Sequence, residues 1–249
     1  MNHQVWNDVI NNNNFIINSK KIRVFPILKK NKDYDRLKID NDSFNFITIR
    51  EISNLITKII CKHLICNNIN PLNTLVVDST AGVGGNTLSF LKFFKKVIAI
   101  EICQIRHEYL VNNINIYEHD NVECLNMSFC EYYKDNITIE NPDVIFMDPP
   151  WGGIGYKNLN NLQLSLDDIH IEDIVINALK RFKLNDDVKK TKLFVLKLPK
   201  NYDIEYFYER LNNEKNEGID ICIFLYVLSK MLLVVCEFKY SNNEKQNIT

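Results

Sequence analysis

"TLVVDSTAGVGGNTLSFLKFF", residues 74–94, contains the pattern from which the fold can be inferred. Its first six residues form a short apolar run that is typical of a buried strand. A glycine loop follows and opens into an apolar segment of helical period, whose start Asn86 or Thr87 can cap. In doubly wound α/β sheets, such a strand–loop–helix unit holds a ligand beyond the carboxyl ends of the strands.

The alternation of strands and helices continues along the chain. Further strands are expected at 97–101, 121–127, 143–148, 192–199, 219–228 and 231–238. Helices are expected at 104–117, 167–183 and 203–211. Only Ser229 and Lys230 join the last two strands, too few residues for a crossover, so the final strand must run antiparallel. The pattern predicts an α/β, Rossmann-like fold with a mostly parallel seven-stranded sheet and an antiparallel last strand.

The chain divides into three parts. Residues 1–70 are predicted to form a helical N-terminal extension, with low-complexity "NNNN" at 11–14 and an amphipathic helix at 49–66. Residues 71–240 hold the α/β domain, and residues 241–249 are expected to be a disordered tail.

Charge and cysteine content restrict the function classes. The net charge of −1 gives no overall basic field, so a nucleic acid has to be gripped locally. The 7 cysteines form no CxxC pair, which argues against structural zinc and for reduced thiols inside a cell. Without a signal pattern or a run of transmembrane length, we expect an intracellular monomer of the nucleus or cytoplasm, neither secreted nor bound to a membrane.

A second distinctive stretch is "FMDPPWGG", residues 146–153. The two prolines cannot continue a strand ladder, and the glycines allow the backbone to turn or to approach a ligand. A lone Pro-Pro-Trp is most often a strand-end turn with a core tryptophan. The surrounding sequence must therefore decide whether this one is a structural turn or part of a functional site.

Glu101 ends the second predicted strand, where a carboxylate can accept the hydroxyl groups of a ribose. A solvated acid at a strand end is the plain alternative. Two nucleoside cofactors fit this position, a dinucleotide and S-adenosylmethionine. The loop Gly-Val-Gly-Gly-Asn-Thr lacks the third glycine of the dinucleotide fingerprint. The antiparallel last strand and the Asp-Pro-Pro-Trp corner favour S-adenosylmethionine, with no metal.

With these motifs the chain resembles the trimethylguanosine synthase family, the RNA cap guanine-N2 methyltransferases. The resemblance rests on "DSTAGVGGNT" (78–87), "VIAIEI" (97–102), "VNNINIY" (111–117) and "DPPWGGIGY" (148–156). It also includes "LKIDNDSFNFITIREI" (37–52) and "LKLPKNYDI" (196–204), and so extends over about residues 36–238 in collinear order. It implies a class I S-adenosylmethionine-dependent methyltransferase domain at 71–240 and an extension that helps to close the site.

The resemblance also implies an activity, the methylation of the exocyclic N2 of 7-methylguanosine caps on RNA. Whether one methyl group or two are added stays open. Residues carried over as catalytic are Asp148, Pro149 and Trp151. Those carried over to the cofactor are Thr48, Asp78, Ala81, Gly82, Gly84, Asn86, Thr87, Glu101, Ser128 and Asp148. Those carried over to the cap are Lys38, Trp151, Tyr156, Lys200 and Lys230.

Three positions depart from the family pattern. Asp148 stands where the family more usually has serine, as in amino-methyltransferases generally. Ser128 stands where an acid beside the adenine is expected. Lys200 replaces an arginine, which exchanges a bidentate phosphate fork for a point charge.

Two other functions are also compatible with the sequence. An amino-methyltransferase acting on internal guanine N2 or adenine N6 would show no preference for a 7-methylguanosine head. A catalytically silent cap or RNA reader would keep the fold but need no cofactor.

Overall fold

The computed structural model describes residues 20–29, 31–135, 141–181, 190–214 and 219–240. Seven strands form one sheet in the order β3-β2-β1-β4-β7-β9-β8. They are β1 (Leu75–Asp78), β2 (Lys96–Ile100), β3 (Val122–Leu125), β4 (Val144–Met147), β7 (Leu193–Pro199), β8 (Ile219–Leu228) and β9 (Met231–Tyr240). The strands from β3 to β7 pair in parallel, and β9 runs antiparallel to both of its neighbours. The predicted sheet is therefore confirmed; the predicted tail lies outside the described residues.

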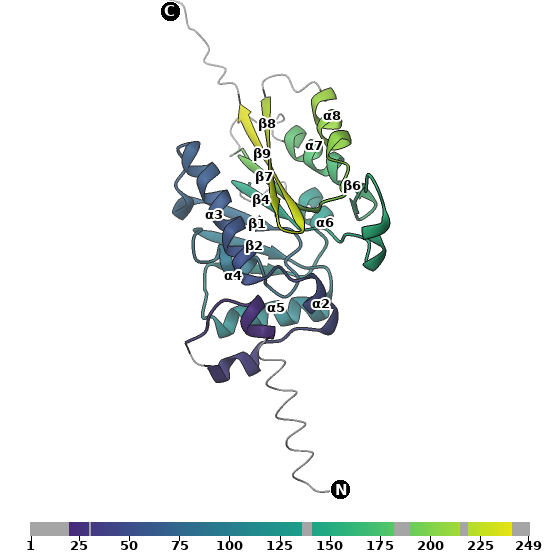
Figure 1. Ribbon diagram of the computed structural model, residues 1–249. Helices are drawn as coiled ribbons and strands as arrows, with labels where there is room; N and C mark the ends of the chain where they lie inside the picture. Colours follow the sequence, from purple (N-terminus) through teal and green to yellow (C-terminus); the bar gives the residue numbers. More distant parts are fainter. Residues whose placement is uncertain (1–19, 30, 136–140, 182–189, 215–218, 241–249) are drawn as a thin grey trace, which may run out of the picture.

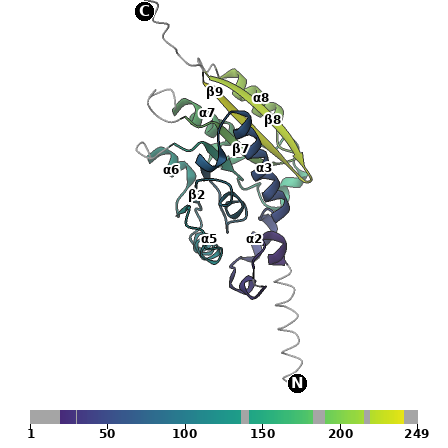
Figure 2. The ribbon, with the colours of Figure 1, turned by 90° about the vertical axis from the view of Figure 1, so that its left-hand side faces the viewer.

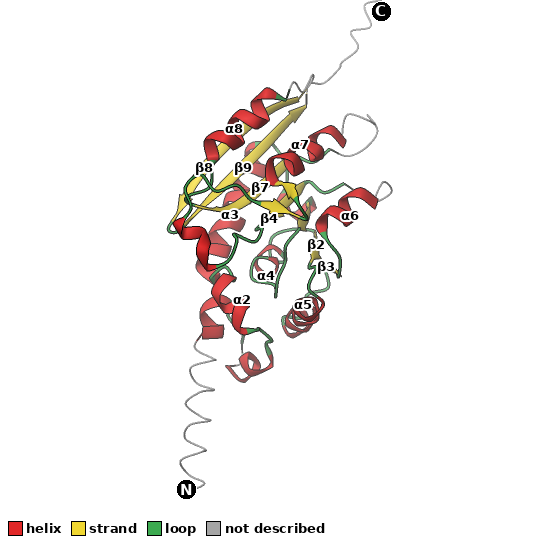
Figure 3. Cartoon of the chain, turned by 90° about the vertical axis from the view of Figure 1, so that its right-hand side faces the viewer, coloured by secondary structure: helices red, strands yellow, loops and turns green. Residues whose placement is uncertain are grey.

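Helices cover both faces of this sheet (Figures 1 and 2). One face packs against α3 (Arg50–Cys66), α4 (Thr87–Phe90) and α5 (Gln104–Ile116). The other packs against α6 (Phe129–Asp135), α7 (Ile171–Arg181) and α8 (Ile204–Asn213), seen together in Figure 3. Double coverage explains why β1, β4 and β7 are buried along their whole length and are rich in valine, isoleucine and leucine.

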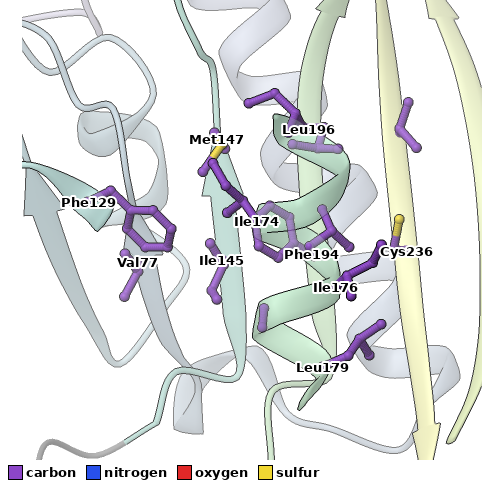
Figure 4. Close-up of a cluster of buried hydrophobic side chains, with 14 of the residues drawn as sticks. Val77, Phe129, Ile145, Met147, Ile174, Ile176, Leu179, Phe194, Leu196 and Cys236 are labelled. Atoms are coloured by element: carbon purple, nitrogen blue, oxygen red, sulfur yellow. The ribbon is translucent and has the colours of Figure 1, made fainter. Parts of the chain in front are cut away.

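Alternate residues of neighbouring strands build the core beneath α7. Ile145 and Met147 of β4 lie beside Phe194 and Leu196 of β7, and Ile174 of α7 packs over them (Figure 4). Burying a side chain of this size contributes about 1.5–3 kcal/mol, so this layer fixes the strand ends that carry the site.

The structure corrects the expected helix at 167–183. Residues 165–170 instead form a hairpin, β5 (Ser165–Leu166) and β6 (Ile169–His170), and α7 begins only at Ile171. Asp167 and Asp168 turn the hairpin with φ of 49° and 60°, the conformation of a two-residue type I′ turn. The strands are too short to show a two-residue period, and Asp-Asp is a weak turn sequence, so no local pattern indicates the hairpin.

The N-terminal extension packs directly on the glycine loop. Its described part includes a 3₁₀ helix at Asn31–Arg36 and α2 (Asn41–Phe46), which lie beside α5 (Figure 1). The buried Asn113 side chain of α5 donates to the carbonyls of Lys38 (2.8 Å) and Val83 (2.9 Å) and accepts from the Lys38 N–H (2.8 Å). One side chain thus fastens the extension, the loop and α5 together.

The extension is also fastened to the far end of the sheet. His63 of α3 lies 2.5 Å (Nδ1) from Glu237 of β9 and 2.8 Å (Nε2) from the Tyr226 hydroxyl of β8. Both His63 and Glu237 are buried, so these contacts hold α3 against β8 and β9. Within the described ranges, no helix has the length and apolar character to cross a bilayer.

Close packing at Gly85 couples the extension to the loop. A Cβ atom at this position would lie 2.7 Å from Ile47 Cγ1 and 3.5 Å from the Thr48 carbonyl oxygen. Real Cβ atoms do not approach carbon so closely, and Ile47 Cγ1 is not the flexible end of a side chain. Only glycine at position 85 therefore lets the segment before α3 rest against the loop.

We predict that Gly85→Ala lowers the free energy of unfolding by about 1–3 kcal/mol, because the new methyl group displaces Ile47. Combined with Ile47→Ala, the loss should be smaller than the sum of the two single losses. Thermal and denaturant unfolding measure both. Gly155→Ala is the matched control, since no described atom lies within 4 Å of its added Cβ. Equal losses at positions 85 and 155 would contradict the packing argument.

Candidate functional site

Three carboxylates lie at the carboxyl edge of the sheet. Asp78 ends β1, Glu101 follows β2 and Asp148 follows β4. Asp78 is buried, its Oδ2 accepts a 2.6 Å hydrogen bond from Thr87 Oγ1, and its Oδ1 has no hydrogen-bond partner among the described residues. Burial, reinforced by Asp148 and Glu101 and opposed by the Thr87 hydrogen bond, raises the pKa of Asp78 to about 7.

Backbone N–H groups of the glycine loop and of Cys103 bind the second carboxylate, Glu101. Glu101 accepts hydrogen bonds of 2.8 Å from the Gly82 N–H and the Cys103 N–H, and the Ala81 N–H donates to the Ile100 carbonyl. Gly82 and Gly84 have φ of 56° and 101°, which favours glycine at both positions. No described atom lies within 4 Å of a Cβ added to Gly82, so the backbone there faces open space.

Thr48 and Asn86 connect the extension to this edge. Asn86 Nδ2 donates to Thr48 Oγ1 over 3.1 Å, and both side chains are buried. Asn86 Oδ1 is a second buried oxygen without a hydrogen-bond partner in the described part of the chain. Asn86 occupies the N-cap position of α4, but its Oδ1 accepts no capping hydrogen bond from the first turn of that helix.

Asp148 is paired with a lysine that the sequence analysis missed. Lys197 Nζ of β7 lies 2.5 Å from Asp148 Oδ2, and Lys197 is only 3% exposed. Burial raises the pKa of Asp148, while Lys197 opposes that rise by charge and hydrogen bond. The Asp148 N–H donates to Thr80 Oγ1 over 2.8 Å, which joins the ends of β1 and β4. A lysine between leucines in "VLKLP" was the available indication of this pair.

Trp151 is half-buried beside this pair. Its ring centroid lies 5.3 Å from Lys197 Nζ and 5.4 Å from the Tyr156 ring, which meets it edge-on at 78°. The loop that carries both rings is held by Asn201, whose Nδ2 donates to the Tyr156 and Leu159 carbonyls over 2.7 Å. Pro149, between Asp148 and Trp151, is buried.

The predicted cap lysines fall in two places. Lys200 and Lys230 are exposed and adjoin the last pair of the β7–β9 ladder: Lys200 follows Pro199, and Lys230, in the β8–β9 turn, precedes Met231. The pairing of Pro199 with Met231 therefore brings the two lysines to the same end of these strands. Lys38 lies elsewhere, exposed on the extension with its ammonium 5.9 Å from the Tyr109 ring centroid of α5.

Ser128 caps α6. Its hydroxyl accepts from the Cys130 and Glu131 N–H groups, while Glu131 accepts from the Ser128 N–H, a reciprocal capping box. The same hydroxyl contacts the carboxylate of Asp167, in the β5–β6 turn. Ser128 and Asp167 line a cavity of about 280 Å³ with Ile102, Cys130, Glu131, Lys134 and Ile169. Sequence reasoning missed Asp167, because only the hairpin brings it to this place.

We predict that Asp78→Asn stabilises the protein relative to wild type as the pH rises from about 4 to 7. In that window folded Asp78 keeps a proton that the unfolded chain has lost, so the wild type loses stability with rising pH and the variant does not. The difference in free energy of unfolding should grow by a few kcal/mol and then level off. Denaturant titrations at pH 5, 6, 7 and 8 test it, with Asp220→Asn, exposed on β8, as control. A difference that is independent of pH would contradict the prediction.

The sheet order, the antiparallel β9, the glycine loop after β1 and the acid after β2 define a class I, S-adenosylmethionine-dependent methyltransferase. The precorrin-6y C5,15-methyltransferase from Geobacter metallireducens GS-15 has the same fold, with a TM-score of 0.54 and 15% identity over 83% of this chain and 96% of that one.

The sequence also matches a family profile and curated relatives. Residues 73–238 match the RNA cap guanine-N2 methyltransferase profile, and the chain belongs to that family. The uncharacterized protein L320 of Acanthamoeba polyphaga mimivirus is 34% identical over 223 residues, 82% of this chain and 83% of the relative. The trimethylguanosine synthase of Schizosaccharomyces pombe is 33% identical over 86 residues, 33% of this chain and 36% of that protein.

Proposed function

We propose that the protein transfers a methyl group from S-adenosylmethionine to the exocyclic N2 of 7-methylguanosine caps on RNA. The observation that carries the proposal is the placement of Trp151 and Asp148 side by side at the end of β4, beside Asp78 and the glycine loop. A ring that can stack on a base and a hydrogen-bond acceptor thus lie next to the edge of the sheet proposed to bind the cofactor. Family membership supports the same substrate.

The residues at this edge fit the cofactor. Asp78 and Asn86 each bring a buried oxygen without a described partner, and Asp78 suits the cationic amino-acid end. Glu101, held by two backbone N–H groups, is oriented to accept the ribose hydroxyls. The open space at Gly82 lets the ligand approach the backbone. Bound S-adenosylmethionine supplies the methyl group as a strongly electrophilic sulfonium.

The cavity of about 280 Å³ suits the adenine ring. Ile102, directly after Glu101, is 65% exposed and offers an apolar surface on which the ring can lie. Ser128 is engaged in capping α6, so Asp167 is the better acceptor for the adenine amine. The acid that the sequence appeared to lack is thus supplied by the β5–β6 turn.

We predict that Asp167→Asn weakens S-adenosylmethionine binding by about tenfold, because a charge-assisted hydrogen bond becomes a neutral one. Asp168→Asn is the matched control, since it makes the same change at the neighbouring turn residue, and asparagine tolerates positive φ as aspartate does. Isothermal calorimetry measures both affinities. Similar losses in the two variants would point to a disturbed turn and not to an adenine contact.

The target amine is a poor nucleophile, since its lone pair is delocalised into the purine ring. Asp148 and the carbonyl oxygen of Pro149 accept hydrogen bonds from its two N–H groups and turn the lone pair toward the methyl group. Orientation therefore supplies most of the acceleration. Asp148 takes the released proton after transfer.

Trp151 selects the cap. The 7-methylguanine ring carries a positive charge, and an indole face attracts it by about 1–2 kcal/mol more than plain guanine once desolvated. Because Lys197 already lies over the Trp151 ring, the cap base stacks on the opposite face. Lys200 and Lys230, at the same end of β7 and β9, hold the triphosphate. Lys38 lies apart from them, beside Tyr109 of α5, and is not assigned to the triphosphate.

We predict methyl transfer to 7-methylguanosine caps in clear preference to plain guanosine caps. Trp151→Phe should keep part of this preference, whereas Trp151→Ala should lose most cap affinity with nearly unchanged cofactor affinity. Radiolabelled methyl transfer and calorimetry measure the two effects, and the melting temperature controls for folding. Equal transfer to uncapped RNA or DNA would favour an amino-methyltransferase of internal bases. Cap binding without turnover or cofactor binding would favour a silent reader.

A further inference from the structure

Lys197 is an unusual residue for its position. It lies in β7 between Leu196 and Leu198, both fully buried, and is itself 3% exposed. An ammonium group so far from water is costly unless a partner compensates it. Its partner is Asp148, at 2.5 Å, whose side chain is 17% exposed. Both residues directly follow the paired Met147 and Leu196 of β4 and β7, so the strand register itself places them side by side.

The same lysine contacts Trp151 in two ways. Its ammonium lies 5.3 Å from the centroid of the indole ring. Its backbone carbonyl accepts a 3.4 Å hydrogen bond from Trp151 Nε1. Lys197 therefore touches both side chains that the proposed reaction assigns to the substrate, the acceptor of its amine and the platform for its base.

The surrounding charges show why the acceptor needs a cation. Lys197 on β7 is the charged group that acts on Asp148, while Asp148 and Glu101 both act on Asp78 of β1. Two further carboxylates, those of Asp78 and Glu101, thus lie at the same edge of the sheet as Asp148. A carboxyl group buried among like charges favours the protonated form, which donates a hydrogen bond where the substrate amine requires an acceptor.

We propose that Lys197 is a positioning residue of the methyl-transfer site, which keeps Asp148 ionised as a hydrogen-bond acceptor and fixes the Trp151 ring beside it. The proposal rests on the proposed function for what Asp148 and Trp151 do. The geometry of the pair itself does not depend on the substrate. Its test therefore needs one measurement without substrate and one with it.

The first measurement is the fluorescence of Trp151 against pH. The chain has 2 tryptophans, so Trp6→Phe leaves Trp151 as the single reporter. With Lys197 present, emission should not report a titration of Asp148 between pH 6 and 9. In Lys197→Met a step should appear in this window, and adding Asp148→Asn should remove it. Asp78, whose pKa lies at about 7, contributes the same step with and without Lys197, so only the step that Lys197→Met adds is assigned to Asp148. If Lys197→Met adds no step, or if the added step survives Asp148→Asn, the proposal is overturned.

The second measurement is kcat against pH on 7-methylguanosine-capped RNA. In Lys197→Met, kcat at pH 7 should fall at least about tenfold and recover toward alkaline pH as Asp148 ionises. A purely structural role would lower kcat equally at every pH, and that result would overturn the proposal. Lys239→Met, an exposed lysine on β9, should behave as wild type. If the wild type does not methylate caps, the proposed function fails while the fluorescence still decides the role of Lys197.

If Lys197→Met does not fold, Lys197→Gln replaces it in both measurements, because glutamine keeps a donor without the charge. The variant that loses both charges, Lys197→Met with Asp148→Asn, should be more stable than Lys197→Met alone. Additive losses of stability in this cycle would show that the two groups are not coupled, and would also overturn the proposal.

Discussion

The burial of carboxylates at one edge of the sheet is the constraint on which the site depends. Parallel strands end at the same edge, so β1, β2 and β4 bring Asp78, Glu101 and Asp148 together. Each is stabilised differently: Asp78 by the Thr87 hydroxyl, Glu101 by two backbone N–H groups and Asp148 by Lys197. Three carboxylates face a single paired lysine, and this excess of negative charge suits the sulfonium and ammonium groups of S-adenosylmethionine.

The N-terminal extension is attached to the same edge of the sheet. Asn113 fastens it to the glycine loop, Thr48 meets Asn86, and Gly85 leaves room for Ile47. At the other end His63 binds Glu237 of β9. The extension is therefore held at both ends of the domain, and it packs directly on the glycine loop beside Asp78 and Glu101.

Hydrogen bonding sets the roles of Ser128 and Asp167 at the cavity beside Ile102. The Ser128 hydroxyl is engaged by the first turn of α6 and by Asp167. The β5–β6 turn thus brings a carboxylate to this cavity from a segment 39 residues away in the sequence.

The sequence alone predicts the seven strands of the main sheet, the antiparallel β9 and the positions of the glycine loop and the Asp-Pro-Pro-Trp corner. These follow from local properties, namely hydrophobic period, turn length, and the conformations allowed to glycine and proline. Only the three-dimensional structure shows that Lys197 contacts Asp148 and that Asp167 reaches Ser128. The reason is physical: these contacts join segments far apart in sequence, and their register is set by sheet pairing and core packing, which no local pattern encodes.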